Sequence, residues 1–301
     1  MGNLSEQLFF RYQEEFQNSI LRLVEPFEKK RIKAIFKMFF FSLFFVSVGV
    51  ILVVFFFYLF LHSIFNTFLW TIILFVIYAF LFRGIFYHVE VVRDFEVEFS
   101  KYILKYFLKP VANFKPWPLN YNKESIIDSG IFPNFVVQED LESYFGFYNK
   151  TNVMITDTSL GTVTPMDKHD LFKGIILQFE FEKKLAEHLI IKPSNALKPI
   201  GYVKLDTRFD NYFSVFSKDK NEDINFIDDE FFELVKNLVL VFGALSFSMS
   251  ISNNIVVVGL PTKTKAFQFR CMFKSLKDIK TYDELIKKFI AVFNLVDKLK
   301  I

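Results

Sequence analysis

The sequence has one cysteine and four histidines among its 301 residues. A single thiol, at Cys271, can form neither an intramolecular disulfide bond nor a cysteine metal cluster, and this is typical of a protein in a reducing cytoplasm. We expect Cys271 to be buried. No two histidines have the i, i+4 spacing of a helical zinc site; they are His62, His88, His169 and His188. We therefore expect no bound metal ion.

The glycine-rich motifs of three large enzyme classes are also absent. The chain has no Gly-x-Ser-x-Gly, no Gly-x-Gly-x-x-Gly after a strand and no Gly-x-x-x-x-Gly-Lys loop. These motifs are key parts of α/β-hydrolases, Rossmann-type dinucleotide-binding proteins and P-loop proteins, respectively. We expect no cofactor, and the sequence assigns no catalytic, cofactor-binding or metal-binding residue.

Charged side chains are absent from Met38 to Phe82. This run is about twice as long as the roughly 20 apolar residues that one membrane-spanning helix requires. A short polar cluster, His62 to Thr67, divides it. We predict a transmembrane helical hairpin over residues 38–86, with its turn at this cluster.

Basic residues flank the apolar run on both sides, whereas the predicted turn has none. Arg83 follows the run. The preceding basic residues are Lys29, Lys30, Arg31, Lys33 and Lys37. Because positive flanks stay in the cytoplasm, we predict a multi-pass protein of the cytoplasmic (inner) membrane with both termini in the cytoplasm.

Apolar residues recur at helical spacing on either side of the hairpin, which predicts two amphipathic helices. One lies in the cytoplasmic region 1–37, and Pro26 predicts a kink or restart in it. Its stripe consists of Leu4, Leu8, Tyr12, Phe16, Ile20 and Leu23. The other is a juxtamembrane helix over residues 87–109. Its stripe consists of Val89, Val92, Phe95, Phe99, Tyr102 and Tyr106. The hairpin would bring the two helices together as an antiparallel stalk.

A proline-rich linker from Pro110 to Pro118 marks a boundary, and we predict a cytoplasmic β-rich domain over residues 110–301. Short β-branched and aromatic runs predict its strands. They cover residues 144–148, 153–158, 161–164, 174–182, 189–191, 202–205 and 213–216. A helix from Asp228 to Phe242, a β-hairpin over residues 245–259 and a helix from Asp283 to Leu299 follow. The predicted fold class is α+β, a membrane hairpin with a helical stalk joined to a mainly antiparallel β domain.

The acidic segment from Asp219 to Glu230 has oxygen side chains at positions 1, 3, 5 and 12 of an EF-hand calcium loop. Position 6, which needs glycine for the sharp turn, is Ile224. We expect this segment to cap the following helix and not to bind calcium.

A second polar cluster could supply acid–base chemistry beside Ser159 or Thr164. Its members are Asp167, His169 and Asp170. Because such residues also serve turn geometry before a strand, we expect a structural role for them.

Several short motifs are similar to those of a family of uncharacterised bacterial membrane proteins. They are Glu142 to Gly146, Phe172 to Ile175, Val203 to Asp206, Phe209, Phe213 to Phe216, Lys218 to Asp219 and Asp228 to Phe232. The resemblance extends over nearly the whole chain and implies an N-terminal membrane hairpin with a cytoplasmic domain of unknown function. It implies no activity, ligand or catalytic residue.

Two classes of function fit the sequence. In the first, a cytoplasmic binding or scaffolding domain is anchored at the membrane; its partners are the lipid bilayer and another membrane or cytoplasmic protein, or a second copy of the chain. The alternative is an unrecognised enzyme acting on a membrane-proximal substrate, or a subunit of an oligomeric membrane transport assembly. The net charge of +3 is too small and dispersed for a nucleic-acid partner.

Overall fold

The computed structural model of the protein describes residues 9–14, 16–62, 87–104, 106, 115–116, 123–163, 168–267 and 269–300. The chain forms two compact units. One, which we call the body, comprises Met1–Asn18, Leu104–Phe267 and Tyr282–Ile301. The other, which we call the stalk, comprises Ser19–Ile103 and Gln268–Thr281. The predicted turn and second span, residues 63–86, lie outside the described residues.

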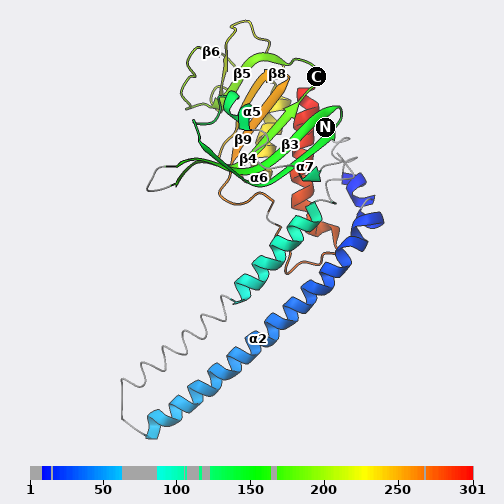
Figure 1. The fold of residues 1–301 in the computed structure, drawn as a ribbon, viewed down its shortest axis with the longest axis vertical. Helices are drawn as coiled ribbons and strands as arrows, with labels where there is room; N and C mark the ends of the chain where they lie inside the picture. Colours follow the sequence, from blue (N-terminus) through cyan, green and yellow to red (C-terminus); the bar gives the residue numbers. More distant parts are fainter. Residues whose placement is uncertain are drawn as a thin grey trace. The chain divides into compact units, whose positions relative to one another are not determined.

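The body is built on an antiparallel sheet (Figure 1) with the strand order β1-β2-β3-β4-β9-β8-β5-β7-β6. Within the described residues the sheet consists of eight longer strands and the two-residue β1. The strands are β1 (Lys115–Pro116), β2 (Val137–Tyr148), β3 (Thr151–Val163), β4 (Lys168–Glu180), β5 (Ala186–Pro193), β6 (Val203–Leu205), β7 (Phe213–Ser217), β8 (Ser248–Asn253) and β9 (Ile255–Pro261). The predicted strands are therefore present, but β3 is one continuous strand where the sequence predicts two. Its last residues, beyond Leu160, stay paired with β4 across a register shift.

Both faces of the central strands are buried, as expected for a sheet covered on both sides. Ile175, Ile176 and Leu177 of β4 are all fully buried although successive side chains point to opposite faces. On one face, Ile176 belongs to a cluster with Ile126 of the short helix α5 (Lys123–Asp128). The two long helices of the body pack on the opposite face of the sheet, where aromatic side chains of the helices contact the strands.

Helix α7 (Asp283–Leu299) has the bounds that the sequence predicts, and α6 (Asp229–Phe242) begins one residue after the predicted Asp228. Asp228 caps α6 by accepting a hydrogen bond from the Phe231 amide, and Gly243 ends it in a left-handed conformation with φ of 61°. The Phe293 ring of α7 stacks on Tyr148 of β2, with centroids 4.2 Å apart. The helix before the last hairpin and the C-terminal helix are therefore confirmed.

The stalk consists of two antiparallel helices. The first is α2 (Leu21–His62), which follows the π-helical turn η1 (Phe16–Ile20). The second covers residues 87–104. Phe27 contacts Phe99 and Phe41 contacts Tyr87, with ring centroids 5.4 and 4.5 Å apart. The predicted antiparallel packing is confirmed for the described residues.

The expectation of a helix restart at Pro26 is wrong, because α2 continues through this residue without a break. The irregularity falls six to ten residues earlier, at η1. Proline removes one helical donor, and its ring crowds the carbonyl four residues earlier. The helix accommodates both effects at Pro26, its sixth residue. The predicted stripe is buried at Tyr12, Phe16 and Ile20, and it continues through Val24 in place of Leu23.

A segment that is irregular as far as Asp278 and then enters the 3-10 helix η2 (Ile279–Tyr282) completes the stalk. We call residues 269–281 the strap. Four side chains of the two helices bind its backbone. Glu96 Oε1 accepts from the Cys271 and Met272 amides (3.0 and 3.2 Å), Ser100 Oγ from the Phe269 amide (3.1 Å) and Glu28 Oε2 from the Leu276 amide (2.9 Å), while Arg31 Nη1 donates to the Met272 carbonyl (3.0 Å). Cys271 is buried here, as predicted.

One member of the predicted basic flank is therefore buried. Arg31 is 9% exposed and also donates two hydrogen bonds to Glu28. Buried charges are paired because isolated ones lose their hydration. Arg31 holds the strap and is not part of a solvated basic surface.

Candidate functional site

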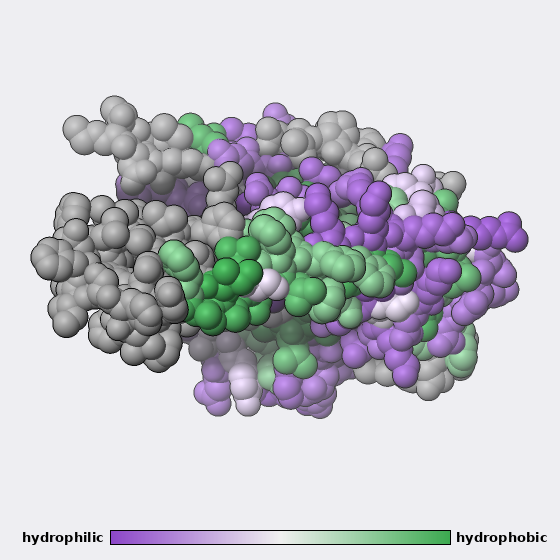
Figure 2. Space-filling model, turned by 90° about the horizontal axis from the view of Figure 1, so that it is seen from below, coloured by the Kyte–Doolittle hydropathy of each residue, from purple (hydrophilic) through white to green (hydrophobic). Residues whose placement is uncertain are grey.

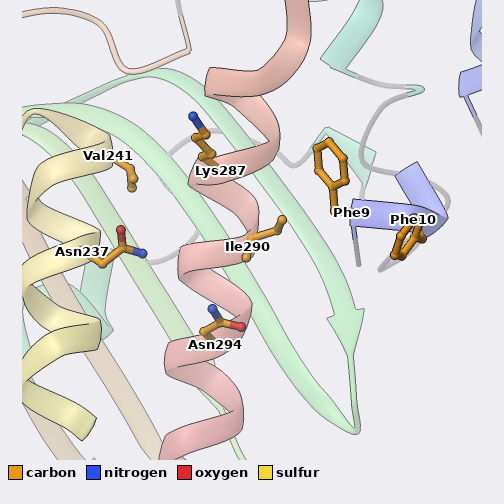
Figure 3. A pocket seen from close by; sticks show the side chains of 7 residues that line it. All are labelled: Phe9, Phe10, Asn237, Val241, Lys287, Ile290 and Asn294. Atoms are coloured by element: carbon orange, nitrogen blue, oxygen red, sulfur yellow. The ribbon is translucent and has the colours of Figure 1, made fainter. Parts of the chain in front are cut away.

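An open groove of about 590 Å³ lies on the helical side of the body. We call it the α7 groove, because α7 lies between the two other helical segments that line it (Figure 3). Its seven lining residues are Phe9, Phe10, Asn237, Val241, Lys287, Ile290 and Asn294. Its volume falls within the range of small-molecule sites.

Helical spacing places the lining residues of α6 and α7 on one side of each helix. Asn237 and Val241 are four residues apart on α6. On α7, Lys287, Ile290 and Asn294 are separated by three and four residues. These residues are exposed or half-buried, whereas the neighbouring stripe of α7 packs into the core. The rigid packing of both helices therefore fixes their positions.

Phe9 and Phe10 come from the N-terminal helical residues 9–14 and line the groove on the other side of α7 (Figure 3). This segment is held by Tyr12 and Phe16, which are completely buried. The Phe16 ring lies 5.2 Å from that of Tyr282, the residue before α7. Burial raises the pKa of Tyr12 far above its ordinary value, so its hydroxyl stays neutral.

The chemistry of the groove suits recognition of an amphipathic molecule. Its two phenylalanines, Val241 and Ile290 offer apolar contact area, and Phe10 is 64% exposed. The Asn237 and Asn294 amides can donate and accept hydrogen bonds, and Lys287 adds a positive charge. Such a lining fits a ligand that has an apolar part and a polar or anionic group.

The acidic segment Asp219 to Glu230 serves turns and the cap of α6. Asp219 accepts a hydrogen bond from the Asn221 amide, and Asp223 accepts one from the Asn225 amide. Lys298 of α7 lies 2.6 Å from Asp228 and 2.9 Å from Glu230, as N–O distances. The bonds from Lys298 and the Phe231 amide lower the pKa of Asp228. The described part of the chain has no group of three or more acidic, histidine or cysteine side chains that could hold a metal ion.

The second predicted polar cluster is assembled in part. Ser159 Oγ on β3 donates a hydrogen bond of 2.8 Å to Asp170 Oδ1 on β4. His169 on β4 pairs with Thr162 on β3 in the ladder between these strands. His169 and Asp170 are therefore part of the sheet and do not lie in the expected turn. Asp167 and Thr164 lie outside the described residues.

A further polar cluster, which the sequence did not indicate, lies beside the α5 face of the sheet. The Tyr202 hydroxyl hydrogen-bonds His188 Nδ1, and Lys218 Nζ lies 5.7 Å from the centre of the Tyr202 ring. Burial and the nearby Lys218 lower the pKa of His188. Burial alone raises the pKa of Tyr202. Both groups are therefore neutral near pH 7, and they join β5 to the segment before β6.

None of the residues that line the α7 groove was singled out in the sequence. Lys287 and Asn294 occupy ordinary polar positions of an amphipathic helix. Phe9 and Phe10 lie about 220 residues from α6 along the chain, and no local pattern links them. One sequence feature points to Phe9 and Phe10: they are adjacent aromatic residues on the polar side of a predicted helix.

Residues 170–301 match the family described as "Protein of unknown function (DUF3137)". This region contains both α6 and α7 but not Phe9 and Phe10. The resemblance to a family of unknown function is thus supported for this part of the chain. It leaves out the motif at Glu142 to Gly146.

No curated protein sequence matches the chain. Among solved structures, the chain is similar to the crystal structure of the mycobacterial trehalose monomycolate transport factor A, TtfA, with a TM-score of 0.31 and 9% sequence identity. The match covers 59% of this chain and 88% of that one. This similarity is distant and too low to indicate a shared function.

Proposed function

We propose that the protein is a membrane-anchored binding protein. In this proposal α2 anchors the chain in the bilayer, and the α7 groove binds a small amphipathic molecule. The observation that carries the proposal is the lining of the groove, in which four apolar side chains surround two amides and one amine. Neither amide titrates, so this lining is suited to hold a ligand rather than to transfer protons.

The exposed side chains of α2 support the membrane anchor. An 18-residue window of the helix has a mean hydropathy of 2.2, and none of it is buried. Figure 2 shows a continuous hydrophobic band on this face of the molecule. The exposed large apolar residues of α2 include Phe36, Phe39, Phe40, Leu43, Phe44, Val46, Val50, Ile51, Val54 and Phe55. In water each such side chain would forgo about 1.5–3 kcal/mol of burial free energy, and this penalty disappears in lipid.

The register of the stalk supports the second span of the predicted hairpin. Ser42 lies beside His88, with a hydrogen bond of 2.8 Å, whereas α2 continues to His62. Twenty more residues of helix extend about 30 Å, and the chain must return over this distance to reach residue 87. A bilayer core is also about 30 Å thick. We propose that residues 63–86 cross it, which leaves both termini in the cytoplasm.

Cysteine labelling in whole cells tests this topology. In a Cys271→Ser background, Asn66→Cys should react with a membrane-impermeant maleimide. Asn3→Cys and Lys300→Cys should react only after the cells are lysed. Labelling of either terminus in intact cells would overturn the proposed orientation.

Site-specific photocrosslinking in native membranes tests the groove. A benzophenone amino acid in place of Ile290 should form an adduct of lipid or small-molecule mass after irradiation. The matched control is the same replacement at Leu240, an apolar α6 residue that is 77% exposed and outside the groove. Asn294→Ala should weaken the adduct at position 290. Equal adducts at both positions, or an adduct of protein mass at position 290, would contradict the proposed ligand.

A further inference from the structure

The buried side and the exposed side of the strap carry different kinds of side chain. Cys271, Met272 and Leu276 are at most 1% exposed, and they pack into the stalk. Phe273, which lies among them, is 74% exposed. Four basic side chains of the strap are also exposed: Arg270, Lys274, Lys277 and Lys280. The strap therefore presents one large aromatic ring with several positive charges.

Charge on the outer side of the strap is predominantly positive. Asp278 is its one acidic residue, and its Oδ1 accepts a hydrogen bond from the Lys280 amide. The exposed acidic side chains of the neighbouring helices are paired with helix cations: Glu25 with Lys29, Glu98 with Lys30, and Glu90 and Asp94 with Arg93. The buried Glu28 and Glu96 accept hydrogen bonds from the strap backbone. The strap's cations are thus available for an anionic partner.

The strap is fixed close to the start of the apolar part of α2. Arg31 binds the Met272 carbonyl, and Met38 begins the uncharged run seven residues later. Seven helical residues extend about 10 Å. The headgroup region adds roughly 5–8 Å on each side of the hydrocarbon core, so the outer side chains of the strap can reach it. Phe273 has the apolar body that inserts at such an interface.

We propose that the strap is a second membrane contact, in which its basic side chains bind anionic lipid headgroups and Phe273 inserts between them. This inference rests on the proposed anchoring of α2. Attraction between Lys or Arg and an anionic bilayer acts within about one Debye length, roughly 8–10 Å. The buried bonds to Glu28, Glu96 and Ser100 hold the strap at this distance without using its outer side chains.

Tryptophan fluorescence of the reconstituted full chain tests the inference. Phe273→Trp is placed in a background in which Trp70 and Trp117 are replaced by Phe. Vesicles contain phosphatidylcholine, or an equal mixture of phosphatidylcholine and phosphatidylglycerol, with bromine on the acyl chains as a quencher. We expect a blue-shifted emission at position 273 and strong quenching in the anionic vesicles. The matched control is Leu197→Trp, at a body position that is 90% exposed.

Charge reversal then tests the role of the basic side chains. Lys274→Glu with Lys277→Glu should abolish most of the quenching at position 273 in anionic vesicles, whereas Lys236→Glu on the exposed side of α6 should leave it unchanged. Because Lys274 and Lys277 are exposed, hydrogen exchange of the strap backbone should be the same in the double variant as in the unsubstituted protein. This measurement separates loss of lipid contact from loss of folding.

Each outcome bears on one proposal. If the protein does not float with the vesicles after an alkaline wash, the membrane anchor is wrong. If it floats but position 273 is quenched no more than position 197, the strap inference is wrong while the anchor stands. Equal quenching in neutral and anionic vesicles would overturn the recognition of anionic headgroups.

Discussion

The body and the stalk hold their backbones together by different means. In the body, neighbouring strands pair through ladders of neutral amide and carbonyl groups, and the buried side chains between the layers are mostly aliphatic or aromatic. The strap of the stalk has no ladder. Its amides donate to Glu28, Glu96 and Ser100, which are 7%, 7% and 3% exposed.

This difference determines how each unit can fail. A ladder contains many equivalent bonds, so the loss of one leaves its neighbours in place. The strap depends on a few side chains, and two of them are carboxylates that can be protonated. The stalk should therefore be sensitive to single substitutions and to acid where the central sheet is not.

The largest effect is expected in the body core. Phe289→Ala removes a completely buried ring that lies 6.0 Å from the Phe267 ring, centroid to centroid. A Phe→Ala cavity typically costs about 3–5 kcal/mol, which corresponds to roughly a hundredfold or greater loss of protection in hydrogen exchange of β4 and β9. Leu240→Ala, at an exposed position of α6, serves as the control. An equal loss of protection in the strap would show that the two units open together.

Removal of one stalk carboxylate should release the strap alone. Glu96→Ala leaves the buried Cys271 and Met272 amides without their acceptor, at about 1–3 kcal/mol for each unsatisfied group. Burial, with the nearby Glu96 charge, raises the pKa of the Cys271 thiol to about 12, so opening of the strap should greatly accelerate its alkylation. Glu98→Ala, at a side chain that is 53% exposed, should leave the alkylation rate unchanged. Unchanged alkylation in Glu96→Ala would refute this role.

Acid should loosen the strap before it affects the sheet. Burial raises the pKa of Glu28, but the hydrogen bonds from Arg31 and the Leu276 amide outweigh it, so the net shift is downward. A carboxyl with a lowered folded-state pKa stabilises the fold fully above its unfolded value, about 4.3. That contribution is lost as the pH falls through the folded-state value. Hydrogen exchange of the Leu276 region, corrected for the intrinsic pH dependence, should increase below about pH 4. The same pH response in Glu28→Gln would contradict the assignment.

The smallest effect is expected at the end of α6. Gly243 has a φ of 61°, and an added Cβ would meet nothing within 4 Å, so Gly243→Ala carries only the backbone strain of the left-handed conformation. That strain is about 1–2 kcal/mol. Exchange of the last amides of α6 should accelerate, with little change in the strap. Gly243→Asn should have a smaller effect because asparagine tolerates this conformation.

Elements with local signals could be predicted from the sequence. Asp228 and Gly243 mark the ends of α6 through cap chemistry that involves only nearby residues. The strands alternate over enough residues to be recognised, and the antiparallel stalk follows from two apolar stripes that flank one uncharged run. The continuity of β3 was missed because Ser159 and Leu160 resemble a break, whereas pairing with β4 carries the strand through.

The strap and the groove depend on contacts between distant parts of the chain. The Cys271 amide and the Glu96 carboxylate are separated by 175 residues, and the Leu276 amide and Glu28 by 248 residues. The strap also has no periodicity of its own. Charged residues such as Arg31 are ordinarily exposed. The sequence therefore did not indicate that Arg31 is buried against the irregular backbone of the strap. Phe9 and Phe10 join α7 only in the folded body.

The long separation between Glu28 and the strap has a consequence for biosynthesis. Ribosomes add about 5–20 residues per second, so the 248 residues between Glu28 and Leu276 require roughly 12–50 s. Glu28 is made at the start of that interval and Glu96 is made 68 residues later, whereas their amide partners are made only at its end. The strap therefore cannot join the two stalk helices until residues 104–267 of the body have been synthesised.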